Sequence, residues 1–199
     1  MELEEVIAQR RSIRKFETKP VEKVKLEKLI EAARLCQSSK NRQPWQFMIL
    51  EGDRKDQVAE IMLQLFDSHD EDLPGYVNSS KHTARIIKNA PVLILVFREP
   101  DDLWTAGDLL SIGAAIEHVC LEAVNLGLGA LWIRDTEYTE KQICAYAGYP
   151  QLQLVSAIAL GYPAEHPLRA REKRPKRFCF RFKDGNPSFF IFPVQPGMI

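Results

Sequence analysis

Residues 106–126 place the strongest constraint on the fold, because their apolar positions run almost all the way round a helix. These positions are Leu109, Leu110, Ile112, Ala115, Ile116, Val119, Cys120, Ala123 and Val124. A helix that is apolar on every side is buried in a core or lies in a subunit interface, and we expect both here. At 199 residues, the chain is long enough to bury such a helix within its own core.

Short apolar runs on either side of this helix predict a sheet. The expected strands are residues 45–50, 92–97, 129–133 and 154–160. The second of these, Val92 to Phe97, is continuously apolar, which is typical of a strand covered on both faces. Helical spacing predicts further helices over residues 2–11, 26–36 and 53–66, and Thr139-x-x-Gln142 is a capping box opening a small helix. The fold class is therefore α+β, one sheet flanked by helices.

Two segments are not explained by this pattern. Residues 67–82 are polar and predict a loop that could act as a lid, followed by a helical turn at 83–89. Phe178, Phe180 and Phe182 alternate with Cys179 and Arg181 before a Lys183-Asp184-Gly185-Asn186-Pro187 turn, and Phe189-Phe190-Ile191-Phe192 comes after it. This pattern over residues 178–192 predicts a hairpin. We expect a main domain of residues 1–177 and an aromatic extension, 178–199, that packs on the domain or on a second subunit.

Composition narrows the range of partners. The chain carries 27 basic and 27 acidic residues, so no global charge favours nucleic acid or a membrane surface. Basic residues cluster locally, at Arg10 to Lys15 and again over residues 169–177, which favours one small anionic ligand. The four cysteines are scattered without metal-ligand spacing; Cys36 and Cys120 are expected to be small core residues. Without metal-ligand spacing, we expect no bound metal. The acidic N-terminus is unlike a secretory signal, so we expect the protein to be in the reducing cytoplasm.

Residues 38–47 join the end of a helix to the start of a strand with a run of hydroxyl and amide side chains. Ser38, Ser39, Asn41 and Gln43 are short or planar donors and acceptors that could reach a flat heteroaromatic ligand. An ordinary Ser/Asn-rich turn explains the same residues. The segment alone leaves both interpretations open.

No catalytic set of side chains is visible in the sequence. The four histidines stand in unrelated contexts, and His118 is expected to be a polar interface or satisfied core residue. Nucleophile, metalloprotease and P-loop motifs are absent, and Gly127-x-Gly129 lacks the dinucleotide fingerprint. Polar, ligand-facing segments without catalytic residues indicate that a cofactor carries the chemistry.

Four segments resemble the FMN-dependent nitroreductase family, in the family's order. Arg10-Arg11-Ser12-Ile13-Arg14-Lys15-Phe16 is similar to its R-R-S-x-R-x-F opening, and Ser38-Ser39-x-Asn41-x-Gln43-Pro44-Trp45-x-Phe47 to its P-S-S-x-N-x-Q-P-W-x-F signature. Residues 121–132 are similar to its L-A-A-x-x-L-G-L-G-S-x-W segment. Gly161-Tyr162-Pro163-Ala164-Glu165 with Arg174-Pro175 is similar to its closing motif.

The resemblance implies a three-layer α/β/α fold with a mixed, mainly antiparallel sheet, in an intertwined homodimer with FMN at the subunit interface. It implies that Arg10, Arg11 and Ser12 hold the phosphate and ribityl chain, and that Arg14 lies near the pyrimidine edge. Ser38, Ser39, Asn41 and Gln43 would reach the flavin of the other subunit. The backbone at Trp132, Ile133 and Arg134 would pass the ring, and Arg171, Lys173 and Arg174 would close on the phosphate.

The implied activity is hydride transfer from NAD(P)H through flavin N5 to an electron-poor acceptor such as a nitroaromatic or quinone, with no side chain as a catalytic residue. The chain departs from the family pattern at Gln37, where proline is usual, and at Arg134-Asp135, an ion-pair-capable couple that could change the charge near N5. Two alternatives stay open. One is a relative with other flavin chemistry, such as dehydrogenation, dehalogenation or flavin consumption, and the other is a non-catalytic flavin-binding or sensing dimer.

Overall fold

A computed structural model describes residues 1–66, 78–167, 180–183 and 186–189. The chain divides into two compact units, Met1–Pro167 and Leu168–Ile199. The first unit contains, in order, α1 (Leu3–Gln9), α2 (Lys23–Arg34), η1 (Ser39–Asn41), β1 (Gln46–Glu51), α3 (Asp53–Leu63), η2 (Gln64–Phe66), α4 (Asn78–Asn89), β2 (Val92–Arg98), α5 (Thr105–Asn125), β3 (Gly129–Ile133), η4 (Asp135–Thr139), α6 (Glu140–Ala147) and β4 (Gln153–Gly161).

The four strands form one sheet in the order β1-β2-β4-β3, and every neighbouring pair is antiparallel. Ile94 of β2 lies opposite Ile49 of β1 on one side and Ile158 of β4 on the other. A single parallel bridge between Ser12 and Ala130 adds the N-terminal segment beside β3. All four predicted strands are confirmed to within about one residue at each end.

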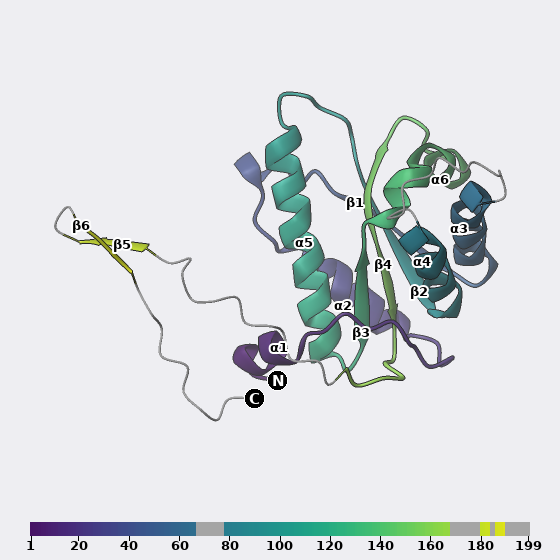
Figure 1. Ribbon diagram of the computed structural model, residues 1–199, viewed down its shortest axis with the longest axis horizontal. Helices are drawn as coiled ribbons and strands as arrows, with labels where there is room; N and C mark the ends of the chain where they lie inside the picture. Colours follow the sequence, from purple (N-terminus) through teal and green to yellow (C-terminus); the bar gives the residue numbers. More distant parts are fainter. Residues whose placement is uncertain (67–77, 168–179, 184–185, 190–199) are drawn as a thin grey trace. The chain divides into compact units, whose positions relative to one another are not determined.

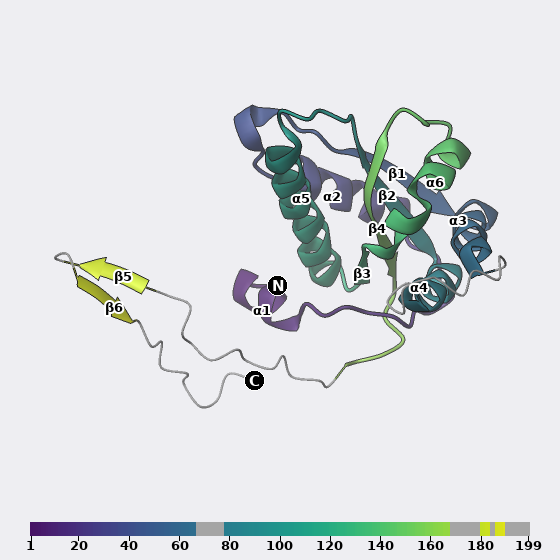
Figure 2. The same ribbon diagram turned by 45° about the horizontal axis from the view of Figure 1, so that its top comes forward.

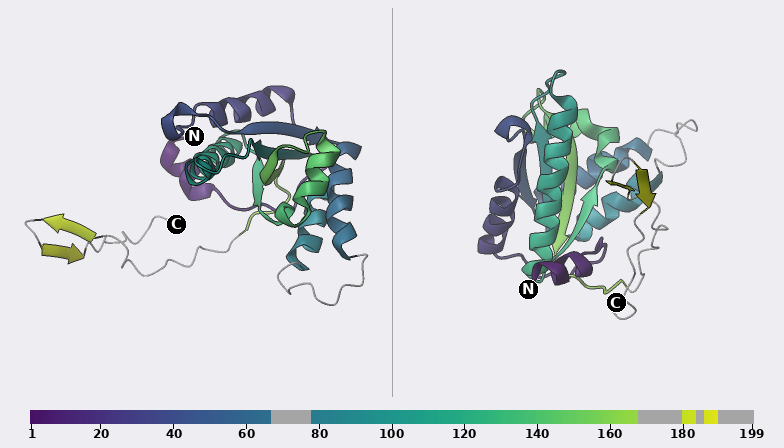
Figure 3. Two further views of the ribbon diagram at one scale, coloured as in Figure 1. Left: turned by 90° about the horizontal axis from the view of Figure 1, so that it is seen from above. Right: turned by 90° about the vertical axis from the view of Figure 1, so that its left-hand side faces the viewer.

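The sheet is the middle of three layers, as the alternation of β2 shows. Val92, Ile94 and Val96 pack with the apolar faces of α2 and α5. Leu93, Leu95 and Phe97 point to the other face, into the core shared with α3, α4 and α6. The two helical layers on opposite sides of the sheet are visible in Figure 1 and, seen from above, in Figure 3. The predicted three-layer α/β/α arrangement is confirmed.

Helix α5 is buried along one side only. Ile112, Ala115 and Val119 are fully buried, whereas Leu109 is 40% and Leu110 77% exposed. The prediction that this helix is central to the core is confirmed, and its exposed apolar side is where a subunit interface remains predicted. No helix in the described part of the chain is both long and apolar enough to cross a membrane.

Two local predictions were wrong in part. The helical turn expected at 83–89 is confirmed as the end of α4. Residues 67–77 of the predicted lid lie outside the described residues, but residues 78–82 are helical and not part of a polar loop, since α4 begins at Asn78. The reason is tertiary, because Ser79 and Thr83 donate to Asp135 at 3.0 and 2.7 Å. The small helix predicted to begin at Thr139 is confirmed as α6, but its capping box is wrong, since Thr139 makes no side-chain cap bond.

The second unit contains the predicted hairpin. Strands β5 (Phe180–Lys183) and β6 (Asn186–Phe189) pair antiparallel, with Phe180 opposite Phe189 and Lys183 opposite Asn186. Two residues separate the strands, as expected for a tight hairpin. The boundary at residue 177 and the packing of the extension stay predictions.

Candidate functional site: polar segments around helix α5

The N-terminal basic segment is held against β3. Ile13 donates its backbone N–H to the Ala130 carbonyl at 3.0 Å, next to the Ser12–Ala130 bridge. The approach is close at Gly129, where an added Cβ would lie 2.7 Å from Ile13 Cγ1. Ser12 is therefore positioned by the edge of the sheet and not by a free loop.

The arginines of this segment keep donors for a ligand. Arg10 Nε pairs with Glu117 of α5 at 3.0 Å, and Arg11 Nη1 donates to the Ala8 carbonyl at 2.7 Å. Arg14 is exposed, with Nη1 3.3 Å from the Ser12 carbonyl oxygen. A guanidinium has five N–H donors, so these contacts orient the three side chains without exhausting them. The arrangement fits an anionic group such as a phosphate.

The segment also contacts the fourth motif. Glu165 accepts the backbone N–H of Arg14 at 2.7 Å and that of Lys15 at 3.3 Å. Ala164 donates to the Lys15 carbonyl at 2.9 Å. The structure therefore brings together residues 12–15 and 161–165, which are about 150 positions apart in sequence. Arg171, Lys173 and Arg174, the other predicted phosphate ligands, lie outside the described residues.

The segment Ser38–Gln43 has a strained backbone. Lys40, Asn41 and Gln43 have φ values of 54°, 55° and 48°, which side chains other than glycine rarely adopt. Gln43 also precedes Pro44, where an extended backbone is the ordinary choice. Each such residue costs on the order of 1–3 kcal/mol and persists only where its surroundings over-determine it.

Side chains of the segment supply part of that support. Ser38 Oγ accepts the Gln43 backbone N–H at 3.0 Å, and Asn41 Oδ1 accepts Gln43 Nε2 at 3.0 Å. The Ser39 backbone N–H donates to Ser111 Oγ of α5 at 3.1 Å. These bonds are the local competition between polar side chains and backbone that the Ser/Asn/Gln composition predicts. An ordinary turn explains the left-handed Asn41, which that residue type tolerates, but not the same conformation at Lys40 and Gln43.

The end of β3 carries the third predicted group. Ile133 is 3% exposed, so only its backbone can face a ligand, and its carbonyl oxygen already accepts Ser156 Oγ at 2.6 Å. Arg134 forms an ion pair with Glu137 at 3.0 Å. Its hydrogen bond to Glu137 is the main cause of the raised pKa of Arg134. Asp135 turns to α4 and not to Arg134. The expected Arg134–Asp135 couple is therefore replaced by an Arg134–Glu137 pair.

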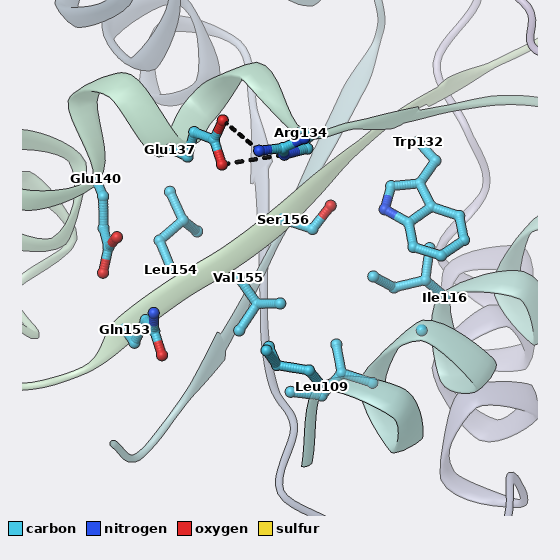
Figure 4. A pocket seen from close by; sticks show the side chains of 12 residues that line it. Leu109, Ile116, Trp132, Arg134, Glu137, Glu140, Gln153, Leu154, Val155 and Ser156 are labelled. Atoms are coloured by element: carbon cyan, nitrogen blue, oxygen red, sulfur yellow. Dashed lines mark hydrogen bonds and ion pairs between the residues drawn. The ribbon is translucent and has the colours of Figure 1, made fainter. Parts of the chain in front are cut away.

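A cavity of about 660 Å³ lies between the first half of α5, the end of β3 and the start of β4. Figure 4 shows the Trp132 indole on the same side as Ile116, with the Arg134–Glu137 pair at the rim. Leucine, isoleucine and valine side chains form the apolar part, and acidic and amide groups the polar part. The lining residues are Leu109, Ile112, Gly113, Ile116, Trp132, Arg134, Glu137, Glu140, Gln153, Leu154, Val155 and Ser156. Such a mixture suits a planar, mainly apolar molecule.

The polar segments contact α5 at separate places. Ser39 reaches Ser111, whereas Arg10 reaches Glu117, six residues or about 9 Å further along the axis. Figures 1 and 2 show η1 beside the N-terminal end of α5 and α1 beside its C-terminal end. Within one chain, the structure does not bring the Ser38–Gln43 segment together with Arg10–Arg14.

Two functional candidates were missed by the sequence analysis. Asp108 is 1% exposed and binds Arg42, at Nε, with a distance of 3.1 Å. The available signal for Asp108 was that it is the only acidic residue in the first half of α5, and nothing in the local sequence pointed to Arg42. His118 is exposed, with Nδ1 3.1 Å from the Ala32 carbonyl oxygen, so it is not a core residue.

Buried cysteines do not supply a nucleophile among the described residues. Cys36, Cys120 and Cys144 are buried and unpaired. Burial, with a smaller effect of Glu117, raises the pKa of the Cys120 thiol to about 12. A thiol with this pKa stays protonated and is unreactive at neutral pH. The prediction that Cys36 and Cys120 are core residues is confirmed.

A three-layer α/β/α fold, polar segments on a central apolar helix and a half-apolar cavity define a class of small-ligand-binding α+β proteins. The model of the Nitroreductase family matches residues 7–162. The chain belongs to this family.

Similar proteins include two curated relatives. A protein of Archaeoglobus fulgidus, named as a proposed NADH dehydrogenase/NAD(P)H nitroreductase, is 27% identical over 169 residues, which is 80% of this chain and 84% of that protein. The iodotyrosine deiodinase of Thermotoga neapolitana is 26% identical over 171 residues, 81% of this chain and 88% of that protein.

Solved structures are similar over nearly the whole length. A BluB-like flavoprotein of Clostridium difficile 630 is 28% identical with a TM-score of 0.73, covering 92% of this chain and 100% of that one. An FMN-dependent nitroreductase of Clostridium difficile R20291 is 25% identical with a TM-score of 0.66, covering 84% and 91%. The resemblance in the sequence motifs is thus confirmed as family membership.

Proposed function

We propose that the protein is an FMN-dependent oxidoreductase that takes reducing equivalents from NAD(P)H and delivers them to an electron-poor acceptor, in a homodimer. The observation that carries the proposal is that the two motifs predicted to hold the ligand, Arg10–Arg14 and Ser38–Gln43, both contact α5, at separate places. Two copies related by a twofold axis would bring Arg10–Arg14 of one chain to Ser38–Gln43 of the other. FMN-dependent members of the family supply the cofactor's identity.

The residues present fit FMN. Arg10, Arg11 and Ser12 offer oriented donors to a phosphate, with Arg171, Lys173 and Arg174 as further predicted ligands. Bound FMN would accept hydride from NAD(P)H and pass it on. The protein's part would be to bind and orient, with Arg14 contributing positive charge near the pyrimidine edge and the backbone at Arg134 facing the ring. The cavity beside Trp132 is the proposed place of the acceptor.

The first test is spectroscopic. Purified protein should be yellow, with an absorption band at about 450 nm that NAD(P)H bleaches, as flavin cofactors show. Turnover should then be measured with a quinone and a nitroaromatic as acceptors. Colourless protein that gains no colour from added FMN would refute the proposal. Tight FMN binding without NAD(P)H consumption would instead favour the non-catalytic flavin-binding or sensing dimer.

The second test is complementation between damaged chains. Arg10→Ala and Asn41→Ala are each expected to weaken FMN binding. In a mixed dimer of the two variants, one site carries both substitutions and the other carries neither, so about half of the sites should recover. No recovery in mixed dimers would show that each site is built within one chain.

Reductive dehalogenation is the second candidate, because a curated relative is an iodotyrosine deiodinase. Such an enzyme would use the same cofactor and be slow with quinones. Iodotyrosine as acceptor, with iodide release measured beside quinone reduction, separates the two activities. We expect a cytoplasmic location for either enzyme.

A further inference from the structure

An ion-pair network fastens the strained Ser38–Gln43 segment to the beginning of α5. Arg42 Nε donates to Asp108 Oδ1 at 3.1 Å, and its Nη2 donates to Asp101 Oδ2 at 3.0 Å. The same guanidinium lies over the Trp104 ring, 4.9 Å from its centroid. We name Arg42, Asp101, Trp104 and Asp108 the Arg42 latch.

The latch is anchored in the core of the molecule. The Asp108 side chain is 1% exposed and that of Arg98, at the end of β2, is 5% exposed, with Nη1 of Arg98 3.7 Å from Asp108 Oδ2. Arg98 is itself held by Gln153 of β4, whose Oε1 accepts Nε at 2.6 Å. The hydrogen bond that Arg42 donates to Asp108 raises the pKa of Arg42, so the guanidinium keeps its charge. A continuous chain of contacts therefore runs from the sheet to Arg42.

Arg42 stands between two of the strained positions. Asn41 and Gln43, on either side, both have positive φ. Ser39 is pinned separately through Ser111. Backbone conformations of this kind persist only where the surroundings enforce them, and Arg42 has the only side chain between Lys40 and Gln43 with a hydrogen bond or ion pair to α5 in the described residues.

We propose that Asp108, acting through Arg42, is a positioning residue for the cofactor. The latch keeps Ser39 and Asn41 in the conformation that meets the flavin, and it does so without touching the flavin itself. The inference rests on the proposed function. When only a fraction of molecules is competent to bind, the apparent dissociation constant rises by the inverse of that fraction.

The primary variant is Arg42→Ala, since Asp108→Asn would leave the buried Arg98 without its counter-ion. Arg42→Lys keeps the charge but not the fork. Arg34→Ala is the matched control, because Arg34 also pairs with a carboxylate, Glu31, at 2.6 Å, but on the exposed side of α2. For each full-length protein, FMN is titrated into the apoprotein by fluorescence, and the thermal midpoint of the apoprotein and the visible circular dichroism of bound FMN are recorded.

Arg42→Ala should raise the FMN dissociation constant by about tenfold to a hundredfold, as expected for losing charge-assisted hydrogen bonds that hold the competent state. Arg42→Lys should lie between it and the wild type. The thermal midpoint of the apoprotein should fall further in Arg42→Ala than in Arg34→Ala, because Asp108, whose side chain is 1% exposed, loses its Arg42 partner. The dissociation constant therefore decides the positioning role, and the visible circular dichroism should change only in the Arg42 variants.

Gly107→Ala tests the same segment from the other side. An added Cβ would lie 3.0 Å from Ser39 Oγ and 3.3 Å from Ser39 Cβ, so Ser39 has to move. Alanine is also the better helix former. We expect FMN binding weakened by about threefold or more in an apoprotein at least as stable as the wild type, a pair of signs that general destabilisation would not produce.

The outcomes separate the two proposals. Normal FMN binding by the wild type together with unchanged binding by Arg42→Ala would overturn the positioning role alone. A lowered thermal midpoint in Arg42→Ala with an unchanged dissociation constant would overturn it as well, in favour of a structural ion pair. Failure of the wild type to bind FMN would overturn the proposed function and this inference with it.

Discussion

Gly129→Ala is expected to destabilise the protein, because β3 and the N-terminal segment approach each other too closely for a Cβ. The added atom would lie 2.7 Å from Cγ1, 2.8 Å from Cβ and 3.0 Å from Cγ2 of Ile13. Carbon atoms in contact prefer about 3.5–4.0 Å, so roughly 0.8 Å of separation must be created. Since Ile13 Cβ is one of the three atoms, a rotamer change is not enough and the backbone of the segment has to move.

The magnitude follows from two opposing effects. Overpacking of this kind costs about 1–3 kcal/mol, and replacing glycine in a strand returns about 0.5–1 kcal/mol. Three contacts at or below 3.0 Å place the overpacking cost in the upper half of its range, about 2–3 kcal/mol. The net loss is then about 1–2.5 kcal/mol, which for a chain of 199 residues lowers the thermal midpoint by about 2–10 °C. Differential scanning calorimetry of the apoprotein measures both quantities.

A second substitution identifies the cause. Ile13→Ala alone removes a buried side chain, which is 8% exposed, and should cost about 2–5 kcal/mol. Combined with Gly129→Ala, it removes two of the three clashing atoms, so the double variant should lose less than the sum of the singles by about 0.5 kcal/mol or more. Additive losses, or a Gly129→Ala variant within about 0.5 kcal/mol of the wild type, would refute this reasoning.

The remaining predictions concern α5, the Tyr162 hydrogen bonds and the cofactor segment. Gly113→Ala should stabilise the protein by about 0.5–1 kcal/mol in urea unfolding, since its Cβ would make an ordinary 3.7 Å contact with Trp132. The hydrogen bond from Tyr162 is the main cause of the lowered pKa of Glu22. That stability is present above the carboxyl's unfolded pKa and is lost as pH falls through its lower folded value, so Tyr162→Phe should differ more from the wild type at pH 7 than at about pH 3, measured by urea unfolding at both pH values. Asn41→Ala should weaken FMN retention more than stability, compared by fluorescence titration and thermal unfolding.

The layered fold was predictable because the residue composition of the strands indicates which of their faces are buried. Val92 to Phe97 has no polar residue, and a strand with two covered faces needs helices on both sides. Helix α4 was not predictable in the same way. Its first turns are rich in hydroxyls, and the acceptor that holds Ser79 and Thr83 is Asp135, more than 50 residues later in the chain. A local pattern cannot show a partner that only the fold brings near.

The candidate site was predictable as segments and not as contacts. The motifs around Ser12 and Ser39 identify which stretches of chain could face a ligand, because their hydroxyls have no role in an apolar core. The Arg42–Asp108 pair joins residues 66 positions apart, and its existence depends on the geometry of the η1 turn. The partners of Arg134 and Asp135 were not predictable for the same reason, since Arg134 pairs with Glu137, one helical turn on, and Asp135 accepts from Thr83 of α4.

Helix α5 connects the fold to the candidate site, because it packs in the core and also contacts the polar segments. Its apolar residues bury it against the sheet, which fixes Asp108, Ser111 and Glu117 at set positions on a rigid element. Asp108 and Ser111 hold the Ser38–Gln43 segment through Arg42 and Ser39, and Glu117 holds the N-terminal segment through Arg10. A helix that was apolar throughout would pack equally well but could not orient those segments. The few polar residues in the apolar helix are therefore the ones that convert core packing into the geometry of the site.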